Sequence, residues 1–149
     1  MLGTVTPCAP RRLADITRPQ PRMISFVLPG EAVPFARAGG GKTVARFTPA
    51  KQRSAMGAVK LFCQRAMAGA LPLDGPVELA ICATYLRPKA RRDDVWKTSR
   101  PDADNISKLI KDALNTVAWR DDAQVCSLHV WKRYGNVASV SVRIVELPQ

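Results

Sequence analysis

The sequence predicts an α/β fold in which a mixed β-sheet carries two helices, with the elements in the order ββαβαββ. Short runs rich in β-branched residues, bounded by Pro, Gly or polar residues, indicate the strands. Two longer segments with apolar residues at every third or fourth position indicate the helices. A length of 149 residues is that of one ordinary domain. We therefore expect residues 23–149 to form a single domain.

The first 22 residues differ from the rest and are predicted to be a disordered, basic, Pro-rich extension. They contain four Pro and four Arg and show no sustained hydrophobic period. They also lack the apolar run of a signal peptide. Met23, where a regular pattern begins, could be an alternative start of the chain.

The first half of the predicted domain contains two strands and a helix. Ile24–Leu28 is a short β-type run that ends at Pro and Gly. A glycine-rich basic loop follows at Phe35–Lys42, and Val44–Thr48 is expected to be the second strand. Pro49 favours the opening of a helix, which we expect over about residues 50–68. The stripe of this helix that should face the core consists of Met56, Val59, Phe62 or Cys63, and Met67.

The second half is predicted to contain a central strand, a helix and two further strands. Val77–Leu86 is rich in strand formers and is expected to be buried. After a polar, basic loop at Arg87–Pro101, a helix should run from residue 102 or 103 to Val117. Its apolar face consists of Ile106, Leu109, Ile110, Ala113, Leu114 and Val117. The last strands, Gln124–Lys132 and Val137–Val145, are expected to pair as a hairpin across Tyr134-Gly135-Asn136.

The composition excludes several protein classes. The longest strongly apolar stretch, Leu79–Leu86, is far shorter than the roughly 18 residues that span a bilayer. The four Cys lie far apart, and His129 is the single His, so neither a zinc site nor a disulfide framework is indicated. We expect a cytoplasmic protein with reduced thiols and no membrane partner. His129 alternates with apolar neighbours in a strand and is expected to be structural rather than a general base.

The charge balance points to a polyanionic partner. The chain carries 23 Lys and Arg against 12 Asp and Glu, a formal net charge of +11, and such an excess favours binding to nucleic acid. A solvated basic surface is the simpler explanation. The distribution of charge along the chain favours a nucleic-acid enzyme over a solvated basic surface, because residues 93–122 hold seven acids against five bases. A nuclease needs such an acidic island, in which carboxylates hold a hard cation while the basic surface gathers phosphates.

The most informative segment is Arg100–Val125, which reads RPDADNISKLIKDALNTVAWRDDAQV. Asp102 or Asp104 could simply cap the helix, and Asp104 could form an ordinary i,i+4 ion pair with Lys108. The Asp121-Asp122 pair could be part of a turn. However, one cap requires one aspartate, whereas four are expected to converge around a single helix start.

The same residues suit the hydrolysis of a phosphodiester. Asp102 and Asp104 can present oxygens to one Mg²⁺, which proteins hold with a few carboxylates. The start of a helix favours a phosphate, and Lys108 could contact a phosphate oxygen or the attacking water. A carboxylate from the Asp121-Asp122 pair could complete the metal site. The metal would act as a Lewis acid and as a source of hydroxide.

PDADNISKLIKDALN followed by WRDDAQV resembles the signature of the RusA-type Holliday junction resolvases, metal-dependent endonucleases that are common in phages and prophages. FVLPGEAVPFAR and RFTPAK are similar to the opening of that family, so the resemblance covers about Ile24–Glu146. It implies a RusA-like fold, a homodimer, Mg²⁺ dependence and symmetric nicking of four-way DNA junctions. The positions that match the family's essential residues are Asp102, Asp104, Lys108 and Asp122, with Asp121 as a less critical partner.

Basic side chains outside this segment are candidates for contacts with DNA. Trp96, in the loop that precedes the acidic segment, could stack on a base or pack on the core. The FARAGGGKT segment lacks the glycine spacing of a P-loop, so no nucleotide cofactor is expected. The DNA-binding candidates are Arg37, Lys42, Arg46, Lys51, Arg91, Arg92, Trp96, Lys97, Arg100 and Lys111.

The predicted function is that of a Mg²⁺-dependent, structure-selective endodeoxyribonuclease that resolves Holliday junctions by paired symmetric nicks in DNA recombination and repair. A homodimer would supply the two cuts. Val137, Val140, Val142 and Val145 in the last strand could pack across its two-fold axis, although burial within one chain explains them at least as well. Two alternatives stay open: a non-catalytic basic DNA-binding module, and a nuclease that acts on another branched substrate or on RNA.

Overall fold

A computed structural model describes residues 20–36 and 49–149 of the chain. Its elements are β1 (Met23–Pro29), α2 (Ala50–Met67), β2 (Val77–Leu86), the 3-10 helix η1 (Lys89–Arg91), α3 (Ala103–Leu114), the 3-10 helix η2 (Asp122–Gln124), β3 (Val125–Gly135) and β4 (Ser139–Glu146). The predicted α/β class is confirmed. The predicted strand Val44–Thr48, most of the Phe35–Lys42 loop and residues 1–19 of the predicted extension lie outside the described residues.

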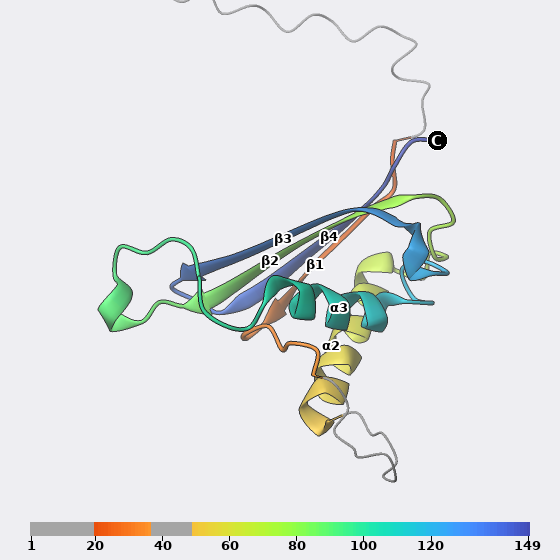
Figure 1. Cartoon of the computed structure of the whole chain (residues 1–149). Helices are drawn as coiled ribbons and strands as arrows, with labels where there is room; N and C mark the ends of the chain where they lie inside the picture. The colour runs from red at the N-terminus through yellow and green to blue at the C-terminus, as the bar shows by residue number, and fades with distance from the viewer. Residues whose placement is uncertain (1–19, 37–48) are drawn as a thin grey trace, which may run out of the picture.

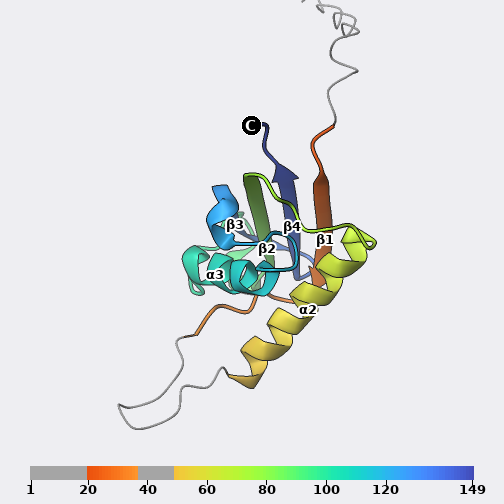
Figure 2. The ribbon, with the colours of Figure 1, turned by 90° about the vertical axis from the view of Figure 1, so that its right-hand side faces the viewer.

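The described strands form one mixed sheet in the order β1-β4-β2-β3 (Figures 1 and 2). β2 pairs antiparallel with β4 on one side and parallel with β3 on the other. β4 also pairs antiparallel with β1. The prediction that Val77–Leu86 is a buried central strand is therefore confirmed.

The predicted hairpin between the last two strands is wrong. β3 and β4 follow each other in the chain, but β2 lies between them in the sheet. The strongly apolar β2 thereby gains a partner along both edges. The chain passes the end of β2 at Gly135, where a Cβ atom would lie 2.6 Å from Cγ2 of Thr84. This close approach explains why glycine occupies the end of β3.

Both helices cover one face of the sheet, and the core lies between the two layers (Figure 2). Alternate residues of each strand point into it, including Val140, Val142 and Ile144 of β4. Val140 and Val142 are therefore buried within one chain, so they do not support packing across a two-fold axis. The opposite face of the sheet carries no helix among the described residues and exposes Val27 and Trp131.

The two helices follow the predicted apolar patterns. In α2, Val59, Cys63 and Met67 are buried. In α3, the predicted stripe is buried from Ile106 to Leu114. The helix ends three residues before the predicted Val117, because Asn115 has non-helical dihedral angles (φ −59°, ψ 133°) and Thr116 a positive φ of 65°.

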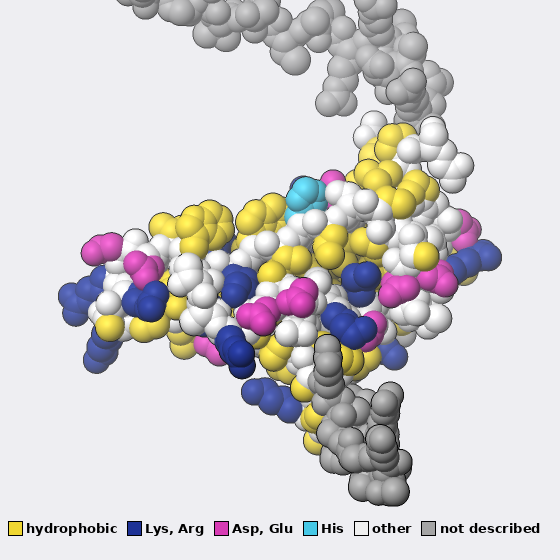
Figure 3. Space-filling model, in the orientation of Figure 1, with side chains coloured by type: hydrophobic (Ala, Val, Ile, Leu, Met, Phe, Trp, Pro, Cys, Tyr) yellow, Lys and Arg dark blue, Asp and Glu magenta, His cyan; other side chains and the backbone are white. Residues whose placement is uncertain are grey.

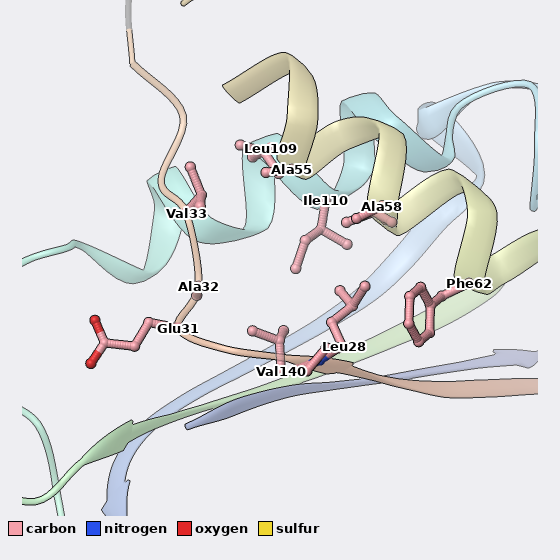
Figure 4. Close-up of a pocket in the computed structure, with 12 residues that line it drawn as sticks. Leu28, Glu31, Ala32, Val33, Ala55, Ala58, Phe62, Leu109, Ile110 and Val140 are labelled. Atoms are coloured by element: carbon pink, nitrogen blue, oxygen red, sulfur yellow. The ribbon is translucent and has the colours of Figure 1, made fainter. Parts of the chain in front are cut away.

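A small pocket separates β1, α2 and α3 (Figure 4). Leu28, Phe62, Ile110 and Val140 point into it, whereas the Glu31 carboxylate points away. Its lining is almost wholly apolar, so the pocket offers no group for chemistry.

No helix within residues 20–36 and 49–149 is long and apolar enough to cross a membrane.

Candidate active site

The start of α3 presents two carboxylates that make no hydrogen bond or ion pair with the residues that the structure describes. Asp102 occupies the N-cap position with extended dihedral angles, but its side chain makes no capping hydrogen bond. Asp104 lies in the first turn, and both side chains are exposed. The capping explanation for Asp102 is thus wrong. Two oxygen-donor groups instead stand at the positive end of a helix dipole, where negative charge is stabilised.

The segment before α3 is fixed to the sheet by Lys132. Its Nζ donates to the carbonyl oxygens of Ser99, at 3.0 Å, and of Pro101, at 2.7 Å. On the other side, the Phe35 N–H donates to the Asn105 carbonyl oxygen at 2.8 Å. These bonds hold the Asp102 backbone at the end of β3 where the strand finishes. A shallow hollow there is lined by Pro34, Phe35, Arg100, Pro101, Asp102 and Asn105.

Lys132 was not among the residues predicted for the site, because the strand that contains it was expected to have only a structural function. Lys132 pairs with Ala83, which belongs to the row of side chains that faces the helices. A lysine at a core-facing position of a strand is unusual, since charged groups are rarely buried without partners. That pattern was the signal in the sequence for a partly buried polar contact.

Lys108 lies one turn into α3 with an exposed side chain. Its Nζ is 3.8 Å from Oδ2 of Asp112 and 4.7 Å from the centre of the Phe35 ring. The ordinary ion pair between Asp104 and Lys108, which was the simpler alternative for these residues, is absent among the described residues. Lys108 therefore does not neutralise Asp104, and its contact with Asp112 is long and exposed.

The two aspartates at η2 differ in their environments. Oδ1 of Asp121 accepts a hydrogen bond from the Ala123 N–H at 2.8 Å and so caps η2. The half-buried Asp122 side chain makes neither a hydrogen bond nor an ion pair with any residue that the structure describes. Asp121 thus has a structural function that explains its presence, whereas the Asp122 carboxylate is free.

The expected convergence of all four aspartates at one helix start is wrong within a single chain. The 12 residues of α3 span about 18 Å at a rise of 1.5 Å per residue, with Asp102 at its first end. η2 lies beyond the other end and leads directly into Val125, the first residue of β3. Lys132, which holds Pro101, lies seven residues further along β3, or roughly 23 Å of extended strand.

The charged side chains seen in Figure 3 agree with this separation: acidic groups lie over both ends of α3, with basic groups between them. Among residues 20–36 and 49–149, no three His, Cys, Asp or Glu side chains are close enough to hold one metal ion. One chain therefore brings Asp102 and Asp104 together but leaves Asp122 at a distance.

The loop between β2 and α3 carries most of the described DNA-binding candidates. Its shape is fixed by Arg87, which donates to the carbonyl oxygens of Arg92 and Asp94 at 2.8 and 2.7 Å. Arg91 forms a salt bridge with Asp94 at 3.1 Å. Lys97 is half-buried, with its Nζ 4.9 Å from the centre of the Tyr85 ring. Arg92, Arg100 and Lys51 are exposed and Lys111 is half-buried, whereas Arg37, Lys42 and Arg46 lie outside the described residues.

Trp96 does not pack in the core, because 57% of its surface is exposed. It forms a β-bridge with Arg133, and directly opposed residues in antiparallel strands share one face of a sheet. That face is the one away from α3, where His129 also stacks on Trp131 with ring centres 5.7 Å apart. Trp96 and His129 are therefore separated from Asp102 and Asp104 by the sheet.

Comparisons with known proteins agree with the sequence motif. The family model described as endodeoxyribonuclease RusA matches residues 29–145. A protein of Bacillus subtilis (strain 168), the uncharacterized protein YqaN, is 42% identical over 59 residues, which are 40% of this chain and 42% of that protein. The crossover junction endodeoxyribonuclease rusA of Lactococcus phage r1t is 30% identical over 73 residues, which are 48% of this chain and 56% of that protein. Both alignments thus span less than two thirds of the relative's length.

Proposed function

We propose that this chain, which belongs to the endodeoxyribonuclease RusA family, resolves four-way DNA junctions by paired symmetric nicks in a reaction that depends on Mg²⁺. The observation that carries the proposal is the pair of free, exposed carboxylates of Asp102 and Asp104 at the start of α3. A phage relative named as a crossover junction endodeoxyribonuclease supports the same substrate. Recombination and repair of DNA are the processes that such an activity would serve.

The residues at the start of α3 fit a hard cation. Asp102 and Asp104 offer oxygen donors, the ligand type that Mg²⁺ prefers, and no capping bond or ion pair among the described residues uses them. When bound, Mg²⁺ would supply Lewis-acid activation of the phosphate and a hydroxide nucleophile.

The protein chain itself would supply the remaining groups that the reaction needs. The free N–H groups of the first turn of α3 would orient a phosphate oxygen. Lys108 would stabilise the negative charge that develops on the phosphate during attack. Its weak contact with Asp112 leaves the ammonium group available for this function.

Asp122 can serve the same site only if it comes from a second copy, because α3 separates it from Asp102 within one chain. We therefore include a homodimer in the proposal. A two-fold axis that sets α3 antiparallel to its counterpart would place each Asp122 beside Asp102 and Asp104 of the other copy. Two such sites would make the two cuts that a four-way junction requires.

The decisive experiment compares nicking of a synthetic four-way DNA junction, a linear duplex and an RNA junction, each with Mg²⁺ and with a chelator. We expect cuts only in the DNA junction and only with Mg²⁺, at symmetric positions in two strands. Asp104→Asn should abolish them, whereas Asp93→Asn, a change at an exposed aspartate of the preceding loop, should not. Binding without any cut would indicate a non-catalytic DNA-binding module, and cuts in RNA a different substrate.

A further inference from the structure

Gln124 ends η2 and directly precedes β3. We propose that it is a positioning residue that holds the Asp122 carboxylate in place for the metal; this inference rests on the proposed function. Sequence reasoning gave Gln124 no function of its own. Its position three residues after Asp121 nevertheless matches the capping-box spacing, in which the two side chains bond each other's backbone.

The Gln124 amide makes four hydrogen bonds, all with backbone groups. Oε1 accepts from the N–H groups of Arg120, at 2.9 Å, and Asp121, at 3.0 Å. Nε2 donates to the carbonyl oxygens of Leu73 and Gly75, both at 2.9 Å. An amide side chain has two acceptor sites and two donor hydrogens. Its full capacity is therefore used.

These bonds join two segments that are far apart in the sequence. Leu73 and Gly75 lie about 50 positions before Gln124 and lead into β2. The Leu73 N–H also donates to the Ala118 carbonyl oxygen at 2.8 Å. The stretch from residue 118 to residue 124 is thus tied at both ends to the segment that leads into the central strand.

Within this stretch, the Asp122 side chain has no hydrogen-bonding partner among the described residues. Its position therefore depends mainly on the backbone and on the packing of its half-buried side chain. That backbone is fixed by the cap from Asp121 and by the four bonds of Gln124, and an exposed ion pair between Arg120 and Asp74 adds a weaker link between the same two segments. Loss of the Gln124 bonds should therefore displace Asp122 without removing any charge from the site.

The test uses the full chain and two substitutions. Gln124→Met keeps the length of the side chain and removes all four bonds. Gln124→Glu keeps the acceptors for Arg120 and Asp121, but it replaces the donors to Leu73 and Gly75 with an oxygen that repels their carbonyl groups. It also adds a negative charge, which should offset part of any loss of metal binding, and it remains informative if the first variant does not fold. The control is Gln64→Met, at an exposed glutamine of α2 that makes no side-chain hydrogen bond with the described residues.

Three quantities are measured: the Mg²⁺ concentration that gives half-maximal nicking of the junction, the dissociation constant for Mn²⁺ from the spin-resonance signal of the free ion, and the unfolding temperature. Outer-shell partners of metal ligands typically contribute about 10- to 100-fold. We expect Gln124→Met to raise the half-maximal Mg²⁺ concentration and the Mn²⁺ dissociation constant by at least about tenfold. Gln124→Glu should raise both values less, and Gln64→Met should leave both unchanged. Binding of the junction without metal should stay at the wild-type level.

A purely structural function would lower the unfolding temperature of Gln124→Met and leave both metal measurements unchanged, which would overturn the inference. Asp122→Asn serves as the reference. If it loses metal binding and nicking while both Gln124 variants behave as wild type, the inference fails and the proposed function stands. If the wild-type chain does not nick the junction at all, the proposed function fails and the inference fails with it.

Discussion

The ammonium group of Lys132 lies 2.7 Å from the carbonyl oxygen of Pro101 and thereby joins the end of β3 to the residue before Asp102. A second bond, to the Ser99 carbonyl oxygen, comes from the same nitrogen. The start of α3 is thus placed by a strand residue that follows it by some thirty positions in the sequence. Asp102 and Asp104 gain a fixed position on the sheet although both lie at the surface.

Lys132→Met should lower both stability and activity. The substitution keeps the aliphatic stem and removes two hydrogen bonds from a charged donor, each of which contributes about 1.5–3 kcal/mol. We expect a lower midpoint in urea unfolding and a rate of junction nicking reduced by at least about tenfold, because a misplaced catalytic group is costly. Lys89→Met, at an exposed lysine of η1, is the matched control and should change neither quantity. An unchanged rate in Lys132→Met would show that the loop keeps its shape without this lysine.

The three free aspartates should be essential for cutting but not for binding. Asp102→Asn, Asp104→Asn and Asp122→Asn should each abolish nicking, and should retain or improve binding of the junction because they remove charge that repels phosphate. Gel-shift and cleavage assays on the same preparations separate the two effects. A variant of Asp104 that cuts at the wild-type rate would refute the site.

Asp121→Asn should be milder, because an asparagine oxygen can still accept the capping bond from the Ala123 N–H. Asp121→Ala removes that bond and should cost about 0.5–2 kcal/mol of stability, the usual range for loss of an N-cap. Chemical denaturation measures this difference. If Asp121→Asn is more severe than Asp122→Asn in the cleavage assay, the assignment of the free carboxylate to Asp122 is reversed.

Lys108→Ala should lose most of the activity and little stability. The side chain is exposed and its contact with Asp112 is long, so the fold gains little from it. Loss of a group that stabilises charge in the transition state typically reduces the rate by about 100-fold or more. Lys108→Arg should retain part of the rate, since it keeps the charge but spreads it over a planar group. Asp112→Asn tests the ion pair separately and should leave the rate near that of wild type.

Much of the fold could be predicted because its signals are local. The apolar period of Ile106 to Leu114 gives the helix and its buried face, and the largely apolar run of strand formers at Val77–Leu86 gives the central strand. The order of strands in the sheet could not be predicted in this way. The order depends on which two strands pair with the two edges of β2. A connection as short as residues 136–138 favours a hairpin unless the rest of the sheet is known.

The acidic site was predicted less completely for a similar reason. Asp102 and Asp104 are two residues apart, so their proximity follows directly from the sequence. The distance to Asp122 depends on α3 as a rigid rod and on the direction of β3, which begins at the far end of that helix. Proximity along the chain was therefore a poor guide to proximity in space. The proposed site, which includes all three carboxylates, would therefore require two copies.

Mixing two inactive variants tests this composite site. If each site takes Asp104 from one copy and Asp122 from the other, a mixed dimer of Asp104→Asn and Asp122→Asn contains one doubly substituted site and one intact site. Refolding the two variants together should therefore restore single nicks in the junction, whereas either variant alone stays inactive. If all three carboxylates acted within one chain, neither site of the mixed dimer would be intact and no cut would appear. Light scattering at micromolar protein and about 0.5 M salt, where exposed charge pairs are heavily screened, should give the mass of a dimer before and after mixing. A strictly monomeric mass under these conditions and on junction DNA would exclude the shared site.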